Sequence, residues 1–161
     1  MPTKYLSSGQ DQMPEPFKLP KFTLKDPRLW HYRCIVLRVV DGDTAMLYRD
    51  KGTYSYDVLK VRLAGIDAPE KRPRVGSAAQ REKEKTLAEA ASKRLEGLIG
   101  GQEVIIHTEK TGKFGRWLAI IEAPTGSIQV EIVDTPKSAN QILLDEGHAV
   151  VYGQPRPWRD E

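Results

Sequence analysis

The sequence predicts an α+β domain in which five short β-strands close into a barrel, one long helix lies between the third and fourth strands, and a short helix stands near the C-terminus. Short runs of β-branched and aliphatic residues, separated by turn residues, indicate the strands. The longest stretch with apolar residues at helical spacing indicates the helix. A chain of 161 residues is long enough for one domain with its own core.

The first three strands are expected at residues 33–40, 44–48 and 58–66. The first run is mostly apolar and β-branched, which favours a strand. An Asp-Gly pair at 41–42 supplies the turn to the second strand, and residues 50–53 contain the next turn. In the third run apolar residues alternate with other residues, the period of a strand that buries one face.

The long helix is expected to begin after Ser77, whose hydroxyl can cap the first turn while Gln80 reaches back to it. Gly100 and Gly101 are expected to end the helix, because glycine adopts the left-handed backbone found at helix ends. Apolar residues at helical spacing predict the face that packs on the core. This face comprises Leu87, Ala91, Leu95 and Leu98.

The fourth and fifth strands are expected at residues 103–107 and 116–121, with a loop at 110–115 between them. A short helix is expected at 138–146, followed by an extended segment at 149–152. Five short strands with a helix after the third give the element order of an OB-like β-barrel.

The chain divides into an N-terminal arm (1–30), the domain itself (31–153) and a polar tail (154–161). Five prolines punctuate the arm, so we expect it to be flexible or loosely packed, with docking to a protein partner as the alternative. No stretch is apolar enough to span a membrane, and no secretory signal is visible. We therefore expect no membrane partner, and a protein that is cytoplasmic or exported by a route the sequence does not reveal.

Charge and cysteine content exclude some classes of site. The net charge of +3 permits a polyanionic partner without requiring one. Cys34 is the sole cysteine, so an internal disulfide and a zinc cluster are excluded, and its apolar neighbours predict a buried side chain. His31, His107 and His148 lack the spacing of a metal motif, and a structural or exposed place is expected for each.

Acidic and basic residues stand at the ends of several predicted strands, at 41–44, Arg62, 67–70 and Arg116. Each alone is ordinary: Asp-Gly-Asp-Thr makes a tight turn, proline ends a strand, and arginines are often solvated. Together they supply what phosphodiester cleavage needs. Carboxylates and a carbonyl suit a hard cation, a further carboxylate can act on water, and arginines suit phosphate.

Four segments closely resemble the signature segments of the staphylococcal nuclease family, in the family's order. They are VVDGDT at 39–44, VRLAGIDAPE at 61–70, KFGRWLA at 113–119 and NQILLDEGHA at 140–149. The resemblance covers roughly residues 32–152. The four segments together are highly specific, whereas Asp-Gly-Asp-Thr alone is weak.

This resemblance implies a Ca²⁺-dependent nuclease that hydrolyses DNA or RNA and leaves 3′-phosphate and 5′-hydroxyl ends. It assigns Asp43, Asp67 and the carbonyl of Ala68 to the metal, Arg62 and Arg116 to the phosphate, and Glu70 to the attacking water. Asp41 is read as supporting structure. Chemistry directed at phosphate reads no base edges, so little sequence selectivity is expected, and DNA and RNA both stay open as substrates.

Some positions depart from the family pattern. Phe114 stands where a nucleotide-contacting tyrosine is usual, and it can stack on a base but cannot donate a hydrogen bond. Tyr152 lies near a second such position, at a shorter spacing from Gly147. Both are expected to contact substrate. Residues 129–137 form an insertion, and a proline-interrupted segment replaces the family's long C-terminal helix.

Two readings other than an isolated enzyme are open. A non-catalytic OB-fold module could bind nucleic acid or protein, but family members of that kind lose the acidic and arginine positions that are present here. A domain of a larger assembly could bind nucleic acid through basic residues around the long helix. These are Arg72, Arg74, Arg81, Lys83, Lys85, Lys93 and Arg94. Glu82, Glu84, Glu89 and Glu96 interleave with them, which favours an ordinary solvated face. The enzyme is preferred, because clustered like charges destabilise a fold unless a cation or substrate offsets them.

Overall fold

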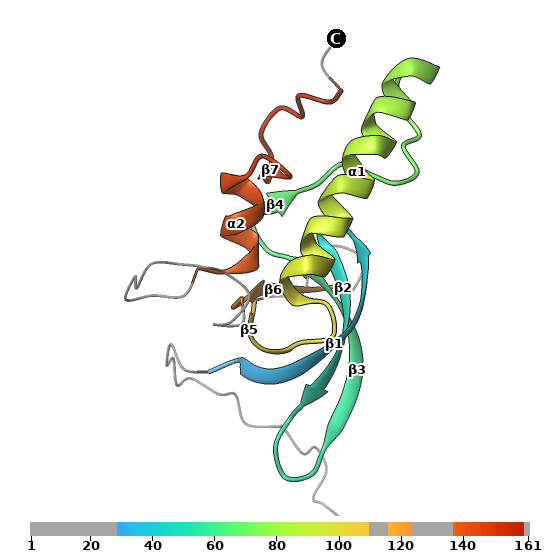
Figure 1. Ribbon diagram of the computed structural model, residues 1–161. Coiled ribbons are helices and arrows are strands. Elements are labelled where there is room, and N and C mark those ends of the chain that lie inside the picture. Colours follow the sequence, from blue (N-terminus) through green and yellow to red (C-terminus); the bar gives the residue numbers. More distant parts are fainter. Residues whose placement is uncertain (1–28, 110–115, 124–136, 160–161) are drawn as a thin grey trace, which may run out of the picture.

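The computed structural model describes residues 29–109, 116–123 and 137–159 (Figure 1). Almost all of the predicted arm, the loop at 110–115 with Phe114, and most of the predicted insertion lie outside these residues. No helix in the described ranges combines the length and the apolar character needed to cross a bilayer.

Five strands of the described chain form a closed barrel in the order β1-β2-β3-β6-β5, which confirms the predicted α+β, OB-like fold. Their bounds are β1 His31–Asp41, β2 Thr44–Asp50, β3 Tyr56–Leu63, β5 Glu103–Thr108 and β6 Trp117–Ile121. Neighbouring strands are antiparallel except β3 and β6, which run parallel. Both helices lie on the same side of the barrel (Figure 1).

The third strand ends earlier than predicted. Gly65 has a positive φ of 75°, and this turn separates β3 from the two-residue strand β4 (Ile66–Asp67). β4 leaves the barrel and pairs with β7 (Val150–Val151) in a separate two-stranded sheet. Tyr152 extends this contact, since its N–H donates to the carbonyl of Gly65 (2.9 Å). The turn therefore carries Asp67 out of the barrel wall and toward the C-terminal segment.

The long helix α1 (Ala78–Ile99) begins with the predicted capping box at Ser77 and Gln80. It ends at Gly100, whose N–H donates to the carbonyl of Glu96 (2.8 Å). The buried face consists of Glu84, Ala88, Ala91, Ser92, Leu95, Leu98 and Ile99. The prediction that Leu87 packs on the core is wrong, because Glu84 and Ala88 take the buried side of that turn and leave Leu87 40% exposed.

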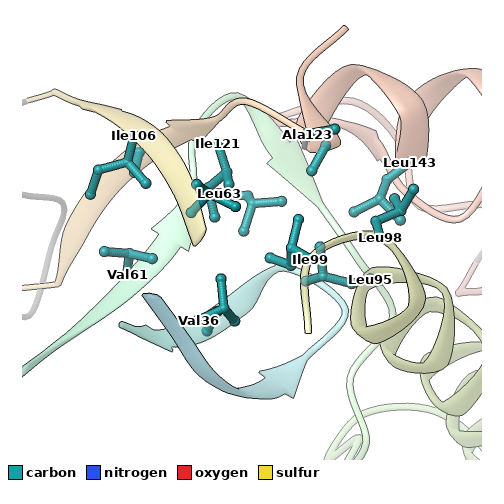
Figure 2. Packing of buried hydrophobic residues seen from close by; sticks show 14 of the residues in the cluster. Val36, Val61, Leu63, Leu95, Leu98, Ile99, Ile106, Ile121, Ala123 and Leu143 are labelled. Carbon is teal, nitrogen blue, oxygen red and sulfur yellow. The ribbon is translucent and has the colours of Figure 1, made fainter. Parts of the chain in front are cut away.

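The core fills the barrel and continues under the two helices (Figure 2). Val36, Leu47, Val61, Ile106 and Ile121 are buried strand residues that alternate with exposed or half-buried neighbours. The helices add a second set of buried residues, Leu95, Leu98 and Ile99 from α1 and Leu143 from α2. Because burial of apolar surface drives folding, this continuous cluster ties the helices to the barrel.

The short helix α2 (Ala139–Asp145) is joined to the barrel by one buried amide, that of Asn140. Its Nδ2 donates to the carbonyls of Ala64 (2.9 Å) and Ala119 (3.1 Å), and its Oδ1 accepts from the N–H of Ile121 (3.1 Å). These backbone groups lie just after β3 and on β6. The side chain therefore satisfies three buried backbone groups at the place where β3, β6 and α2 meet.

Replacing Asn140 by alanine is expected to lower the free energy of unfolding by about 2 kcal/mol or more, because the Ala64 carbonyl and the Ile121 N–H lose this partner and each buried group left unsatisfied costs about 1–3 kcal/mol, whereas the Ala119 carbonyl still accepts from the N–H of Ala64 (2.8 Å). Urea denaturation of both proteins measures the difference. Gln141→Ala, on the exposed side of the same helix, is the control and should change stability by no more than about 0.5 kcal/mol. A loss as small for Asn140→Ala as for the control would contradict this account.

Candidate active site

A pocket of about 540 Å³ opens at one end of the barrel, where the β1–β2 turn, the end of β3, the β4 exit and the start of β6 meet. Its lining is rich in charged residues: Asp41, Asp43, Arg62, Asp67, Glu70, Lys71, Arg72, Arg116 and Arg156. Val40, Thr44, Ala68 and Pro69 complete it. The pocket thus brings together every described residue that the sequence assigned to metal, phosphate or water.

The β1–β2 turn is positioned by backbone contacts on both sides. The carbonyl of Asp43 accepts from the N–H of Leu63 (2.8 Å), and Thr44 is the register partner of Arg62 across β2 and β3. A β-carbon added to Gly42 would lie 2.7 Å from the β-carbon of Ala91 on α1. Glycine is therefore required at this position by close packing against the helix, and its φ is not in the left-handed region.

Two carboxylates share one guanidinium at the floor of the pocket. Arg62 Nη2 lies 3.2 Å from Asp43 Oδ2 and also contacts Asp67 Oδ1. Asp43 Oδ1 accepts from the hydroxyl of Thr44 (2.8 Å). The side chain of Asp67 is only 5% exposed. Asp43 and Asp67 are far apart in sequence, and the structure brings them together, as the sequence predicted. Their shared pairing with Arg62, which the sequence assigned to the phosphate, was not predicted.

Burial is the main influence on the protonation of Asp43. It raises the pKa of this carboxyl above its ordinary value, since water no longer stabilises the charge. Arg62, the Thr44 hydroxyl and the N–H of Ala68 act in the opposite direction, while the charge of Asp67 raises the pKa further. The two acids therefore form a site at which a positive charge would be stabilised.

The donor set fits a hard cation. Asp43, Asp67 and the carbonyl of the buried Ala68 offer only oxygen atoms, the ligands that Ca²⁺ prefers. Among the described residues, no three His, Cys, Asp or Glu side chains form a cluster that could hold a metal ion. A cation bound here would thus have two side-chain ligands and would draw the rest from carbonyls, water or phosphate.

His31 and His107 stack on each other elsewhere in the barrel (ring centroids 4.4 Å apart), and Cys34 is buried, as expected.

Glu70 lies at the mouth of the pocket, and its side chain is 54% exposed. Its N–H donates to Glu84 Oε1 of α1 (3.1 Å), and its carboxylate lies 3.2 Å from Arg159 Nη2. The prediction that Glu84 belongs to a solvated helix face is wrong: Glu84 is 1% exposed. It is retained in the interior because it accepts hydrogen bonds from Arg159 and from the backbone.

The predicted phosphate contacts come from neighbouring strands. Arg116 directly precedes β6, and Trp117 pairs with Val61, so Arg116 and Arg62 approach the pocket from adjacent strands. Tyr152 also lies near the site, with its ring 5.7 Å from the Arg62 guanidinium. Phe114, the other predicted substrate contact, lies outside the described residues.

Three pocket or near-pocket residues were missed by sequence reasoning, namely Lys71, Arg156 and Arg159. Lys71 Nζ donates to the carbonyl of Val40 (2.7 Å) and so ties the β4 exit to β1. Arg156 Nη2 donates to Asp67 Oδ2 (3.1 Å). The sequence at 154–159 predicts a polar tail, but the structure buries its tryptophan, since Trp158 is 6% exposed. The tryptophan between two arginines is the signal of packing in this segment.

Fold and site together define a class: an OB-like barrel of the nuclease type, with carboxylates and arginines gathered at one end. The chain belongs to the staphylococcal nuclease family, since the model of that family, described as "Staphylococcal nuclease homologue", matches residues 60–161.

Several known proteins are similar to the chain. A micrococcal nuclease of Shigella flexneri is 31% identical over 125 residues, which cover 75% of this chain and 59% of the relative. Protein ParB of Escherichia coli is 28% identical (73% and 55% covered), and an uncharacterized endonuclease of Escherichia coli O157:H7 is 27% identical (74% and 60% covered). The chain thus spans a little over half the length of these relatives.

Among solved structures, a mouse extended Tudor domain, in complex with a peptide containing dimethylarginine, aligns with a TM-score of 0.53. The alignment covers 83% of this chain and 97% of the Tudor domain at 7% sequence identity. At this identity the likeness supports the fold alone.

Proposed function

We propose that the domain is a Ca²⁺-dependent nuclease that hydrolyses phosphodiester bonds of DNA, RNA or both with little sequence selectivity. The observation that carries the proposal is the convergence of Asp43, Asp67 and Glu70 with Arg62 and Arg116 on one pocket. Membership of the staphylococcal nuclease family supports the same activity. Since the chain covers only part of its curated relatives, the proposal concerns this domain.

Asp43, Asp67 and the carbonyl of Ala68 would hold the cation. A bound Ca²⁺ would polarise the phosphate and offset the negative charge that develops during hydrolysis. Thr44 keeps one oxygen of Asp43 engaged, which fixes the orientation of that carboxylate. A bound cation would offset the two negative charges of Asp43 and Asp67, which lie close together in a buried site.

Arg62 and Arg116 would bind the phosphate that is cleaved. The planar guanidinium donates two parallel hydrogen bonds to phosphate oxygens, which orients the group as well as neutralising it. The two side chains line one pocket from adjacent parallel strands, so both would contact the same bound phosphate. Their contribution is greatest where charge increases, in the transition state.

Glu70 would orient the attacking water and accept its proton. The oxygen of water forms a bond to phosphorus, the bond from phosphorus to the 5′ oxygen breaks, and the departing 5′ oxygen takes a proton from solvent. The products carry a 3′-phosphate and a 5′-hydroxyl. Glu70 is exposed at the mouth of the pocket, and its backbone is held by Glu84, so its carboxylate can reach both solvent and substrate.

A cleavage assay on single-stranded DNA, duplex DNA and RNA, with Ca²⁺ or with a chelator, tests the proposal. We expect cleavage only with Ca²⁺, and a product whose 5′ end is labelled by polynucleotide kinase without prior phosphatase treatment. Products with a 5′-phosphate would overturn the proposed direction of attack. No cleavage of any substrate with any divalent ion would favour a non-catalytic binding module.

A further inference from the structure

The C-terminal segment 154–159 places a third arginine in the candidate active site. Arg156 lines the pocket, and its Nη2 donates to Asp67 Oδ2 (3.1 Å), while Arg62 contacts the other oxygen of the same carboxylate. The Arg156 side chain is 32% exposed, whereas that of Asp67 is 5% exposed. One buried carboxylate is thus paired with two guanidinium groups, both of which belong to residues that line the pocket.

The segment is anchored at both ends, so Arg156 is held in place. Gln154 N–H donates to the carbonyl of Val151 (3.1 Å), and Arg159 N–H donates to that of Arg156 (2.8 Å). The Arg159 guanidinium binds the buried carboxylate of Glu84 on α1 (3.0 Å), and Trp158 is buried. Figure 1 shows this last part of the chain running beside the helices. A long side chain loses less entropy on binding a ligand when its backbone is fixed in this way.

A divalent cation at Asp67 changes the partners available to Arg156. A cation bound to Asp67 would repel the two guanidinium groups that share this carboxylate, since like charges brought together destabilise the site. When Asp67 turns toward a cation, Arg156 loses its carboxylate partner while it still faces the pocket. A phosphate oxygen of a bound strand is the anion that would replace this partner.

We propose that Arg156 is a phosphate-binding residue of this site, held on Asp67 in the absence of substrate and transferred to a phosphate of the bound nucleic acid strand when a cation takes Asp67. The proposal rests on the proposed function, and it adds a substrate contact supplied by the C-terminal segment. The contribution of Arg156 to strand binding therefore depends on the cation. It is large with Ca²⁺ present and small without it.

The test measures binding of a single-stranded DNA in which methylene groups replace the 5′ bridging oxygens. This strand keeps its phosphate charges and cannot be cleaved at those positions. With Ca²⁺ held constant, Arg156→Gln is expected to weaken binding about tenfold, the effect of losing one charge-assisted hydrogen-bonded contact. The slope of log affinity against log salt concentration should fall by about 0.7, as for one phosphate contact on a single strand. With a chelator, the variant and the parent should bind alike.

Two further variants separate a phosphate contact from a structural role. Arg156→Lys keeps the charge, so it should keep the salt slope even though it loses the planar fork. Arg94→Gln removes another arginine that is paired with a carboxylate, Glu146, outside the pocket, and it should leave affinity and slope unchanged. Purely structural damage would instead weaken binding equally with Ca²⁺ and with chelator.

The outcomes are distinguishable. If the parent binds the strand with Ca²⁺ and Arg156→Gln binds it with the same affinity and salt slope, the role of Arg156 is overturned and the proposed function stands. The same holds if Arg156→Gln weakens binding equally in both conditions. If the parent itself neither binds the strand nor cleaves natural DNA or RNA with Ca²⁺, the proposed function and this inference fail together.

Discussion

Replacing Arg116 by alanine is expected to slow Ca²⁺-dependent cleavage by about 10³-fold or more while leaving the fold intact. An arginine that stabilises a phosphoryl transition state contributes on the order of 10³–10⁵ in rate. Arg116 is half-buried at the start of β6 and lines the pocket, so its loss opens no cavity in the core. The reduction should therefore appear in kcat, and the midpoint of thermal unfolding should change little.

Two further variants test whether the loss of rate comes from the Arg116 guanidinium itself. Arg116→Lys should recover only part of the rate, because an ammonium group keeps the charge but lacks the two parallel donors of guanidinium. Arg38→Ala, which removes an exposed arginine of β1 outside the pocket lining, should cleave at the normal rate. Normal turnover by Arg116→Ala would remove this residue from the mechanism.

Asp43→Asn is expected to abolish most of the Ca²⁺-dependent activity and, at the same time, to stabilise the protein near pH 7. Burial raises the pKa of Asp43 in the folded state. A carboxyl with a raised folded pKa contributes stability below its unfolded pKa and loses that contribution as the pH rises through the folded value. At neutral pH the ionised carboxylate therefore destabilises the fold, and the neutral amide removes that effect.

Urea denaturation in chelator, at neutral pH and at a pH below the ordinary Asp value of 3.8, measures this effect. The gain in stability should be present at neutral pH and should disappear at the low pH. Asp57→Asn is the matched control with the opposite sign, because hydrogen bonds from Arg49 lower the pKa of Asp57. That variant should lose stability at neutral pH. An Asp43→Asn protein less stable than the parent at pH 7 would contradict the account.

Local sequence patterns predicted most of the fold, because each element carries its own signal. The capping box at Ser77, the alternation in β3 and the Asp-Gly turn at 41–42 all depend on near neighbours in the chain. Strand ends were less predictable. Gly65 breaks the third strand because the following residues pair with β7, far away in sequence.

Local sequence patterns likewise predicted some residues of the candidate site and missed others. Asp43, Arg62, Asp67 and Glu70 stand in segments whose pattern is specific, and the structure brings them into one pocket. Glu84 and Arg156 carry no such local signal. Glu84 is buried because its partners are Arg159 and a backbone N–H, and Arg156 reaches the pocket because the tail folds back onto α1. Such long-range pairs depend on tertiary packing, which a single sequence does not encode in its local pattern.

The central claim is that Glu70 and the cation-binding acids act together in phosphodiester hydrolysis. The most direct measurement is the single-turnover rate of single-stranded DNA cleavage by the parent and by Glu70→Gln, each with Ca²⁺ and with a chelator. The account predicts rapid cleavage only by the parent with Ca²⁺, and a rate lower by about 10²–10⁴-fold in Glu70→Gln, the usual contribution of a general base. Equal rates for the two proteins, or cleavage that persists in chelator, would contradict it.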